Sequence, residues 1–153
     1  MRPAIASHRS FRLGRGIFPL LLIVLWALAP APGLAQDAGS LNIQLNKLEP
    51  DGDACRAYIV LENRGAQSFE ALRLDLVMFD TDGVIARRLA VDAAPLAAGR
   101  TSVRVFAISG LACGDIGRVL LNDVLNCADA DGEIRDCMER ITPESIADVP
   151  FIK

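Results

Sequence analysis

Histidine and tryptophan are nearly missing from this 153-residue sequence, which has one residue of each type. Both, His8 and Trp26, lie within the first 35 positions, so positions 36–153 contain neither. Histidine is the side chain that titrates near neutral pH and the commonest metal ligand. Its absence from positions 36–153 excludes a Ser-His-Asp or Cys-His catalytic arrangement and a histidine-ligated metal site there. We therefore expect a protein that is not an enzyme and that has no cofactor.

Basic residues are also scarce after position 35. The sequence has 16 Lys and Arg against 19 Asp and Glu, and four of the arginines precede position 36, where no acidic residue occurs. Positions 36–153 therefore have 12 basic and 19 acidic residues, a formal net charge of −7. Because binding to nucleic-acid phosphates needs a basic surface, we expect no nucleic-acid partner.

The first 35 residues have the three-part pattern of a secretory signal peptide. A basic segment, 1–16, precedes the apolar run 17–29, and the small residues Gly33 and Ala35 stand before Gln36. A membrane-spanning helix needs about 20 apolar residues, whereas this run has 13 and prolines follow it. We expect cleavage after residue 35 and a periplasmic or secreted protein, which contacts the membrane only through the signal peptide before cleavage.

Four cysteines lie in the part expected to be exported, and such a set predicts two disulfides, for which three pairings exist. Two of the cysteines bracket a segment with an Asp-Gly turn, so a bridge across the neck of this hairpin is geometrically natural. No Cys-x-x-Cys occurs, and the close spacings of a four-cysteine zinc site are missing, which disfavours redox and zinc functions. The natural pairing joins Cys127 to Cys137 and Cys55 to Cys113, and the sequence leaves the other two pairings open.

Alternation of apolar and other side chains is the dominant pattern after position 40, and a period of two is typical of half-buried strands. Turn sequences such as 50–53 and 80–83 separate the alternating segments. We predict one all-β domain over 36–153, an immunoglobulin-like antiparallel β-sandwich with a C-terminal hairpin and tail, the tail beginning with a short helix at 142–145. The predicted strands are residues 41–46, 57–62, 72–79, 84–90, 103–108 and 118–125.

The stretch from Tyr58 to Ile108 resembles the exported bacterial immunoglobulin-like sandwiches of the FxLyD type. The segments that carry the resemblance are Tyr-Ile-Val-Leu-Glu-Asn at 58–63, Leu-Arg-Leu-Asp-Leu-Val-Met-Phe-Asp at 72–80, Gly-Val at 83–84 and Pro-Leu-x-x-Gly at 95–99. The whole chain is also similar to small exported proteins of proteobacteria. These resemblances imply a periplasmic or secreted sandwich, and they bring no catalytic residue with them.

Acidic residues gather in three predicted turns and offer an alternative function, the binding of calcium or another small ligand. Asp129-x-Asp131-Gly132-Glu133 superficially resembles a calcium loop. Aligning Gly132 with the glycine of such a loop, however, puts Cys127 and Met138 at ligand positions. We therefore expect a solvated hairpin tip and no metal site. The other acidic turns hold Asp51 with Asp53 and Asp80 with Asp82, where we likewise expect turn formers.

Apolar side chains also occupy the nominally outward positions of three predicted strands: Tyr58, Val60, Val77, Phe79, Phe106 and Ile108. Small monomers seldom expose large apolar patches, so a second layer should cover this face. The sequence favours cover by the C-terminal segment 141–153. The alternative is a face that binds an envelope protein, formed by Tyr58, Val77, Phe79 and Phe106.

Arg87-Arg88 is the one adjacent basic pair after position 35. Because alternation directs the two side chains to opposite faces, a solvated strand edge is the simpler interpretation, and contact with an anionic partner is the alternative. The absence of catalytic chemistry, the expected export and the apolar face together lead to one functional hypothesis. The chain is a non-enzymatic exported protein-binding or envelope accessory module.

Overall fold

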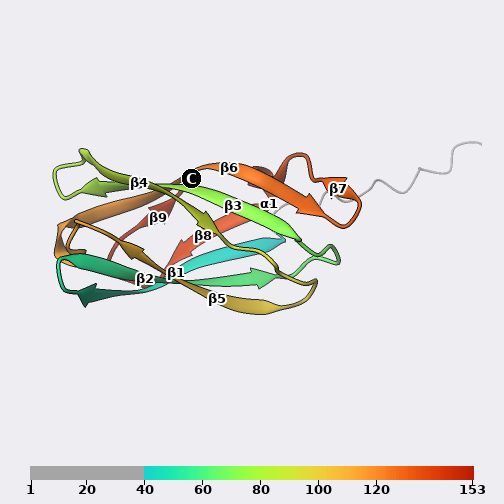
Figure 1. Ribbon diagram of the computed structural model, residues 1–153, viewed down its shortest axis with the longest axis horizontal. Helices are drawn as coiled ribbons and strands as arrows, with labels where there is room; N and C mark the ends of the chain where they lie inside the picture. The colour runs from blue at the N-terminus through green and yellow to red at the C-terminus, as the bar shows by residue number, and fades with distance from the viewer. Residues whose placement is uncertain (1–39) are drawn as a thin grey trace, which may run out of the picture. The chain divides into compact units, whose positions relative to one another are not determined.

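The computed structural model describes residues 40–153, and these residues form two β-sheets packed face to face (Figure 1). The predicted signal peptide lies outside the described residues. The strands are β1 Leu41–Asp51, β2 Ala54–Asn63, β3 Ala71–Asp80, β4 Ile85–Asp92, β5 Thr101–Ile108, β6 Ile116–Asp129, β7 Gly132–Glu133, β8 Ile141–Ser145 and β9 Phe151–Ile152. A one-turn 3-10 helix, Cys113–Asp115, precedes β6, and the four-residue helix α1, Cys137–Arg140, precedes β8. The predicted β-sandwich is confirmed.

The order and direction of the strands can be given for each sheet in turn. The first sheet has the order β5-β2-β1-β8, and the second has the order β4-β3-β6-β7, with β9 also paired to β6. Most neighbouring strands are antiparallel, as predicted. The C-terminal strands are the exception, because β8 runs parallel to β1 and β9 runs parallel to β6.

The residues predicted to face inward on β2 and β3 are buried, as the alternation implies. On β3 the side chains of Leu74, Leu76 and Met78 are buried in the core, and β1 buries Leu41 and Ile43 in the same layer. Burial of each such side chain contributes about 1.5–3 kcal/mol to the free energy of unfolding. The core therefore lies between the sheets and joins both layers into one unit.

The phase predicted for β5 is wrong, because Phe106 and Ile108 point inward and the valines point outward. Phe106 lies opposite Ala57, and Ile108 lies opposite Cys55, both on the inner face of β2. Directly opposed residues share a face of a sheet, so pairing with β2 sets the direction of every side chain on β5. Alternation alone could not set it, because apolar residues occupy both faces of this strand.

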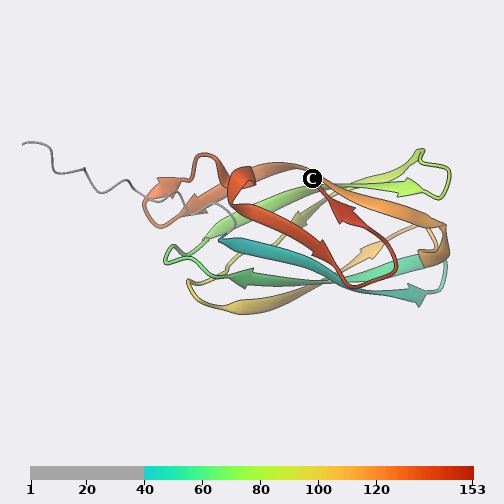
Figure 2. The ribbon, with the colours of Figure 1, turned by 180° about the vertical axis from the view of Figure 1, so that it is seen from behind.

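The C-terminal segment also differs from the prediction. Residues 142–145 are part of β8 and do not form a helix, since Ile141 is fully buried and the strand pairs with Leu41–Leu45 of β1. Figure 2 shows β8 beside β1, followed by a crossover to β9 in the other sheet. The segment thus extends both sheets at their borders and does not cover an outer face. The expected covering role of residues 141–153 is wrong.

Both disulfides have the pairing that the hairpin argument favoured. Cys55 pairs with Cys113 over a sequence separation of 58, and Cys127 pairs with Cys137 over a separation of 10. Cys55 is the second residue of β2, while Cys113 follows β5, so the first bridge links this strand pair to the 3-10 helix. Disulfides persist in proteins of oxidising compartments. No helix among residues 40–153 is long and apolar enough to cross a membrane.

Candidate functional site

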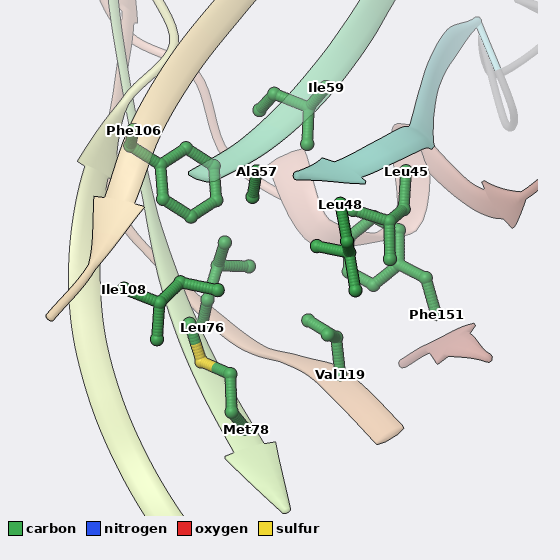
Figure 3. Close-up of a pocket in the computed structure, with 10 residues that line it drawn as sticks. All are labelled: Leu45, Leu48, Ala57, Ile59, Leu76, Met78, Phe106, Ile108, Val119 and Phe151. Carbon is green, nitrogen blue, oxygen red and sulfur yellow. The ribbon is translucent and has the colours of Figure 1, made fainter. Parts of the chain in front are cut away.

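The four residues predicted to form a partner face do not lie together. Tyr58 is on the outer face of the first sheet, whereas Val77 and Phe79 are on the outer face of the second sheet. Phe106 points into the core and lines an interior space with nine other side chains (Figure 3). The predicted face is therefore wrong: its residues lie on two different outer faces and at one interior position.

The interior space around Phe106 is a packing gap. Its volume is about 10 Å³, and its lining holds only carbon and one methionine sulfur (Figure 3). A cavity of this size is at the lower limit for one water molecule, and a water needs polar partners that are missing here. The inward position of Phe106 thus serves the core and offers no site for a ligand.

Polar side chains cover the centre of the outer face of the second sheet. Asp75, at the centre of β3, is only 2% exposed, because Arg88 donates two hydrogen bonds of 2.8 Å to its carboxylate and Asn122 donates one of 2.6 Å. The Arg88 hydrogen bonds hold the pKa of Asp75 below its ordinary value, although burial raises it. The Arg118 guanidinium stacks 4.3 Å from the centre of the Phe79 ring.

The outer face of the first sheet carries an apolar patch. Val105 lies opposite Tyr58, and Val103 lies opposite Val60, so the four side chains are neighbours on two adjacent strands. Val103 and Val105 are 54% and 50% exposed. We call Tyr58, Val60, Val103 and Val105 the valine patch. The alternation in the sequence predicted an outward Tyr58 but not the two exposed valines, because only the pairing of β5 with β2 sets their direction.

The border strand β5 beside this patch has a free edge. Residues 101–108 pair with β2 in an unbroken register, and no other backbone hydrogen bond reaches them from residues 40–153. The strand contains no proline, glycine or bulge. Its one charged residue, Arg104, donates to the Pro95 carbonyl at 3.0 Å, to Ser102 Oγ at 2.6 Å and to the carbonyl of its neighbour Val103 at 3.2 Å. Charged residues, proline and bulges are the usual protection of a strand edge.

A buried asparagine fixes the start of β5. Asn63 is 1% exposed, and its Nδ2 donates to the carbonyls of Gln67 and Ala97 at 2.7 and 3.1 Å. Its backbone N–H donates to the Arg100 carbonyl at 2.9 Å. Buried polar groups need such partners. These bonds hold the connection before β5 against the end of β2 and thereby place Arg100 at the beginning of the free edge.

Arginines surround this edge in a domain that is acidic. Residues 84–112 contain four arginines and one acidic residue, Asp92. Arg87, on β4, donates to the carbonyls of Ser109 and Gly110 at 3.0 and 2.7 Å, just beyond the end of β5. Within residues 40–153, no ion pair joins a carboxylate to Arg87, Arg100 or Arg104. The start, middle and end of the edge thus each carry an arginine, and we call these three the edge arginines.

The acidic turns use their carboxylates to shape the chain. Asp129 Oδ1 accepts the N–H groups of Asp131 and Gly132 at 2.9 and 3.0 Å, while its Oδ2 accepts a hydrogen bond from Gln67. The Gln67 bond and these N–H groups lower the pKa of Asp129. Asp80 Oδ1 binds the N–H groups of Asp82 and Val84 in the same manner. No group of three or more potential metal ligands occurs within the described part of the chain.

Comparison with known proteins supports the fold and gives no function. No protein-family model and no curated protein sequence matches this chain, so the FxLyD resemblance stays a prediction. The structure is similar to that of IrmA from Escherichia coli, with a TM-score of 0.50 and 13% sequence identity. The match covers 67% of this chain and 89% of the IrmA chain. Similarity at this level concerns the sandwich alone, because unrelated functions share such folds.

Proposed function

We propose that this chain is a non-enzymatic protein-binding module of the periplasm or the extracellular space, and that it binds a partner protein through the valine patch and the free edge of β5. The observation that carries the proposal is this border strand, which has no proline, glycine or bulge and whose one charged side chain binds a single main-chain carbonyl of the strand, that of Val103. Long edges with exposed apolar side chains pair readily with other chains, so natural proteins usually block them. We infer that this chain uses the edge of β5 for binding.

The surroundings of the patch suit a protein interface. Ion pairs flank the apolar centre, including Arg56–Asp51 at 2.5 Å and Arg64–Glu62 at 2.6 Å. An apolar centre with a polar, solvent-accessible rim is typical of protein–protein interfaces. Tyr58 adds an aromatic side chain, a type that is enriched among the residues that dominate binding energy.

The proposed location rests on two independent features. Two disulfides are typical of proteins that fold in an oxidising compartment, and positions 1–35 have the pattern of a cleaved secretory signal. Identification of the N-terminal residue of the protein recovered from cell fractions tests this part. Gln36 as the first residue, in the periplasmic fraction or the medium, supports export. An uncleaved chain in the cytoplasm contradicts it.

Affinity capture from envelope extract tests the binding function. The bait is the protein expressed from the full chain, either unchanged or as the double variant Val103→Lys/Val105→Lys. Ile85→Lys is the matched control, because Ile85 is 64% exposed and lies on β4, the border strand of the other sheet. We expect the same partner with the unchanged protein and the control, and its loss with the double variant. Equal recovery by all three baits, or no partner with any of them, contradicts the proposal.

A further inference from the structure

We infer that the free edge of β5 takes up an extended, acidic segment of a partner polypeptide, which adds to the first sheet as a further strand. This inference rests on the proposed function and names the kind of partner. The first sheet has four strands, and β5 is its one long border. The added strand would lie beside β5 on the side away from β2.

The shape of the site favours an extended segment over a folded surface. Alternate residues of a border strand direct their N–H and C=O groups away from the sheet, where another strand can bind them. Eight residues at about 3.3 Å per residue give an edge of roughly 26 Å. The unbroken register of β5 means that no bulge interrupts this edge. On the outer face, alternate side chains of the added strand would extend the row formed by Val103 and Val105.

The positive charge along the edge indicates that the bound segment carries acidic side chains. The edge arginines Arg100, Arg104 and Arg87 stand at the start, middle and end of β5 and have no carboxylate partner within residues 40–153. Ser102, Arg104 and Phe106 alternate with the exposed valines. A strand with apolar residues toward the valines and carboxylates at the alternate positions would place its charges beside Ser102 and Arg104. Complementary charge also speeds the encounter of two partners.

The same arginines argue against a second copy of this chain as the occupant. Antiparallel pairing of β5 with β5 of another copy would bring two sets of edge arginines together. Like charges directly opposite each other on paired strands are destabilising. An acidic segment from a different protein removes this repulsion and gives the arginines the carboxylate partners they lack.

Synthetic peptides test the inference directly. The probe is acetyl-Thr-Glu-Val-Glu-Val-Glu-Val-Thr-amide, and two matched peptides serve as controls. The first control replaces the three glutamates by lysines. The second keeps the glutamates and carries N-methyl groups at alternate residues on its bonding side, which prevents strand pairing. Amide hydrogen exchange and chemical shifts of residues 101–108, measured by NMR on the protein expressed from the full chain, report the binding.

We expect the glutamate peptide to slow exchange on β5 and to bind at least about ten-fold more tightly than the lysine peptide. The N-methylated peptide should leave exchange on β5 unchanged. Arg100→Glu should weaken binding of the glutamate peptide, while Arg135→Glu, an exposed arginine on the terminal hairpin, should leave it unchanged. Arg100 suits this test because none of the hydrogen bonds found in residues 40–153 uses its side chain.

Other outcomes overturn the inference in recognisable ways. Equal binding of the glutamate and lysine peptides, or of the N-methylated peptide, contradicts an acidic added strand, as does the absence of any binding at millimolar concentration. A dimer in sedimentation experiments that Val105→Lys dissociates would identify a second copy as the occupant. If capture of a partner from extract still depends on Val103 and Val105 in these cases, the proposed function stands while the inference fails. If it does not, both fail.

Discussion

The two borders of the first sheet are built in opposite ways. At one border β8 has five residues with Pro143 at its centre, and the chain then crosses to the second sheet as β9. At the other border β5 has eight residues, no proline and no following strand beside it. A proline lacks the N–H that pairing needs, and a crossover covers the neighbouring edge. One border is therefore closed by the chain itself, and the other is left open.

Arg104 shows that this difference is not a matter of composition alone. A charged residue in the middle of a border strand usually protects it, and β5 has one. The guanidinium of Arg104, however, binds the Pro95 carbonyl, which belongs to the connection that leads from β4 to β5. The guanidinium therefore reaches the connection before β5, and on the backbone of β5 itself it binds one carbonyl, that of Val103, at 3.2 Å.

Removal of residues 141–153 should lower the stability of the domain more than any other change considered, because it removes strand β8, which forms the closed border. Ile141 is fully buried and Phe151 is 6% exposed, so the deletion opens the core in two places. Loss of a buried Phe or Ile side chain lowers the free energy of unfolding by about 2–5 kcal/mol. The whole free energy of unfolding of a domain of this size is about 5–15 kcal/mol. We expect no cooperative thermal transition by circular dichroism.

Ile146→Lys is the control for this deletion, since Ile146 lies in the same segment and is 65% exposed. Its melting temperature should match that of the unchanged protein. A cooperative transition in the truncated protein, close to that of the full chain, would show that the closed border is dispensable for folding. In that case the contrast between the borders would lose its structural basis.

Removal of a disulfide should have the second-largest effect on stability. The two disulfides can be compared with the two borders of the first sheet, because each is attached near a different border. Cys55 lies opposite Ile108, the last residue of β5, whereas Cys137 begins the helix that leads to β8. The chain-entropy description gives about 4 kcal/mol for the longer loop and about 3 kcal/mol for the shorter one. We expect Cys55→Ser/Cys113→Ser to lower the denaturation midpoint more than Cys127→Ser/Cys137→Ser, as measured in urea. The reverse order would show that the hairpin before β8 is the more dependent region.

Loss of the Asp75–Arg88 pair should lower the free energy of unfolding by a smaller amount, which depends on pH. This pair lies on the outer face of the second sheet, whereas the valine patch lies on the outer face of the first. The pKa of Asp75 is lowered in the folded protein, chiefly by its hydrogen bonds from Arg88. The resulting stabilisation is therefore complete above the unfolded pKa of about 3.9 and is lost as the pH falls through the lower folded value. Asp75→Asn should cost about 1 kcal/mol at pH 7, since water screens the exposed side of the pair.

Urea unfolding of the two proteins between pH 7 and pH 2.5 measures this difference. The difference in free energy of unfolding between the unchanged protein and Asp75→Asn should begin to shrink below about pH 4 and continue to shrink as the pH falls further. Asp82→Asn is a suitable control, because Asp82 is an exposed turn residue whose side chain makes no ion pair within residues 40–153. A gap that stays constant across this range would mean that the carboxylate of Asp75 does not stabilise the outer face by its charge.

The sequence carried enough information for the architecture but not for the surface. Alternation on β3 located four inward side chains correctly, because only one of its faces is uniformly apolar. The same rule failed on β5, where valines occupy one face and Phe106 and Ile108 the other. Thr142-Pro143-Glu144 has a helix-start pattern, yet burial of Ile141 against β1 outweighs a short helix that is marginal by itself. Long-range pairing decided both cases, and local sequence does not contain it.

Val105→Lys should have the smallest effect on stability and the most specific effect on function. Val105 is 50% exposed on the border strand, so a lysine there can keep its charge in water. The free energy of unfolding should change by less than about 0.5 kcal/mol, whereas the same residue placed at buried Ile141 on the opposite border should prevent folding. Because lysine on an edge repels an approaching strand, partner capture should fall although the fold is intact. Full partner binding by a stable Val105→Lys protein would show that the interface lies elsewhere and that the open border of β5 is not the binding site.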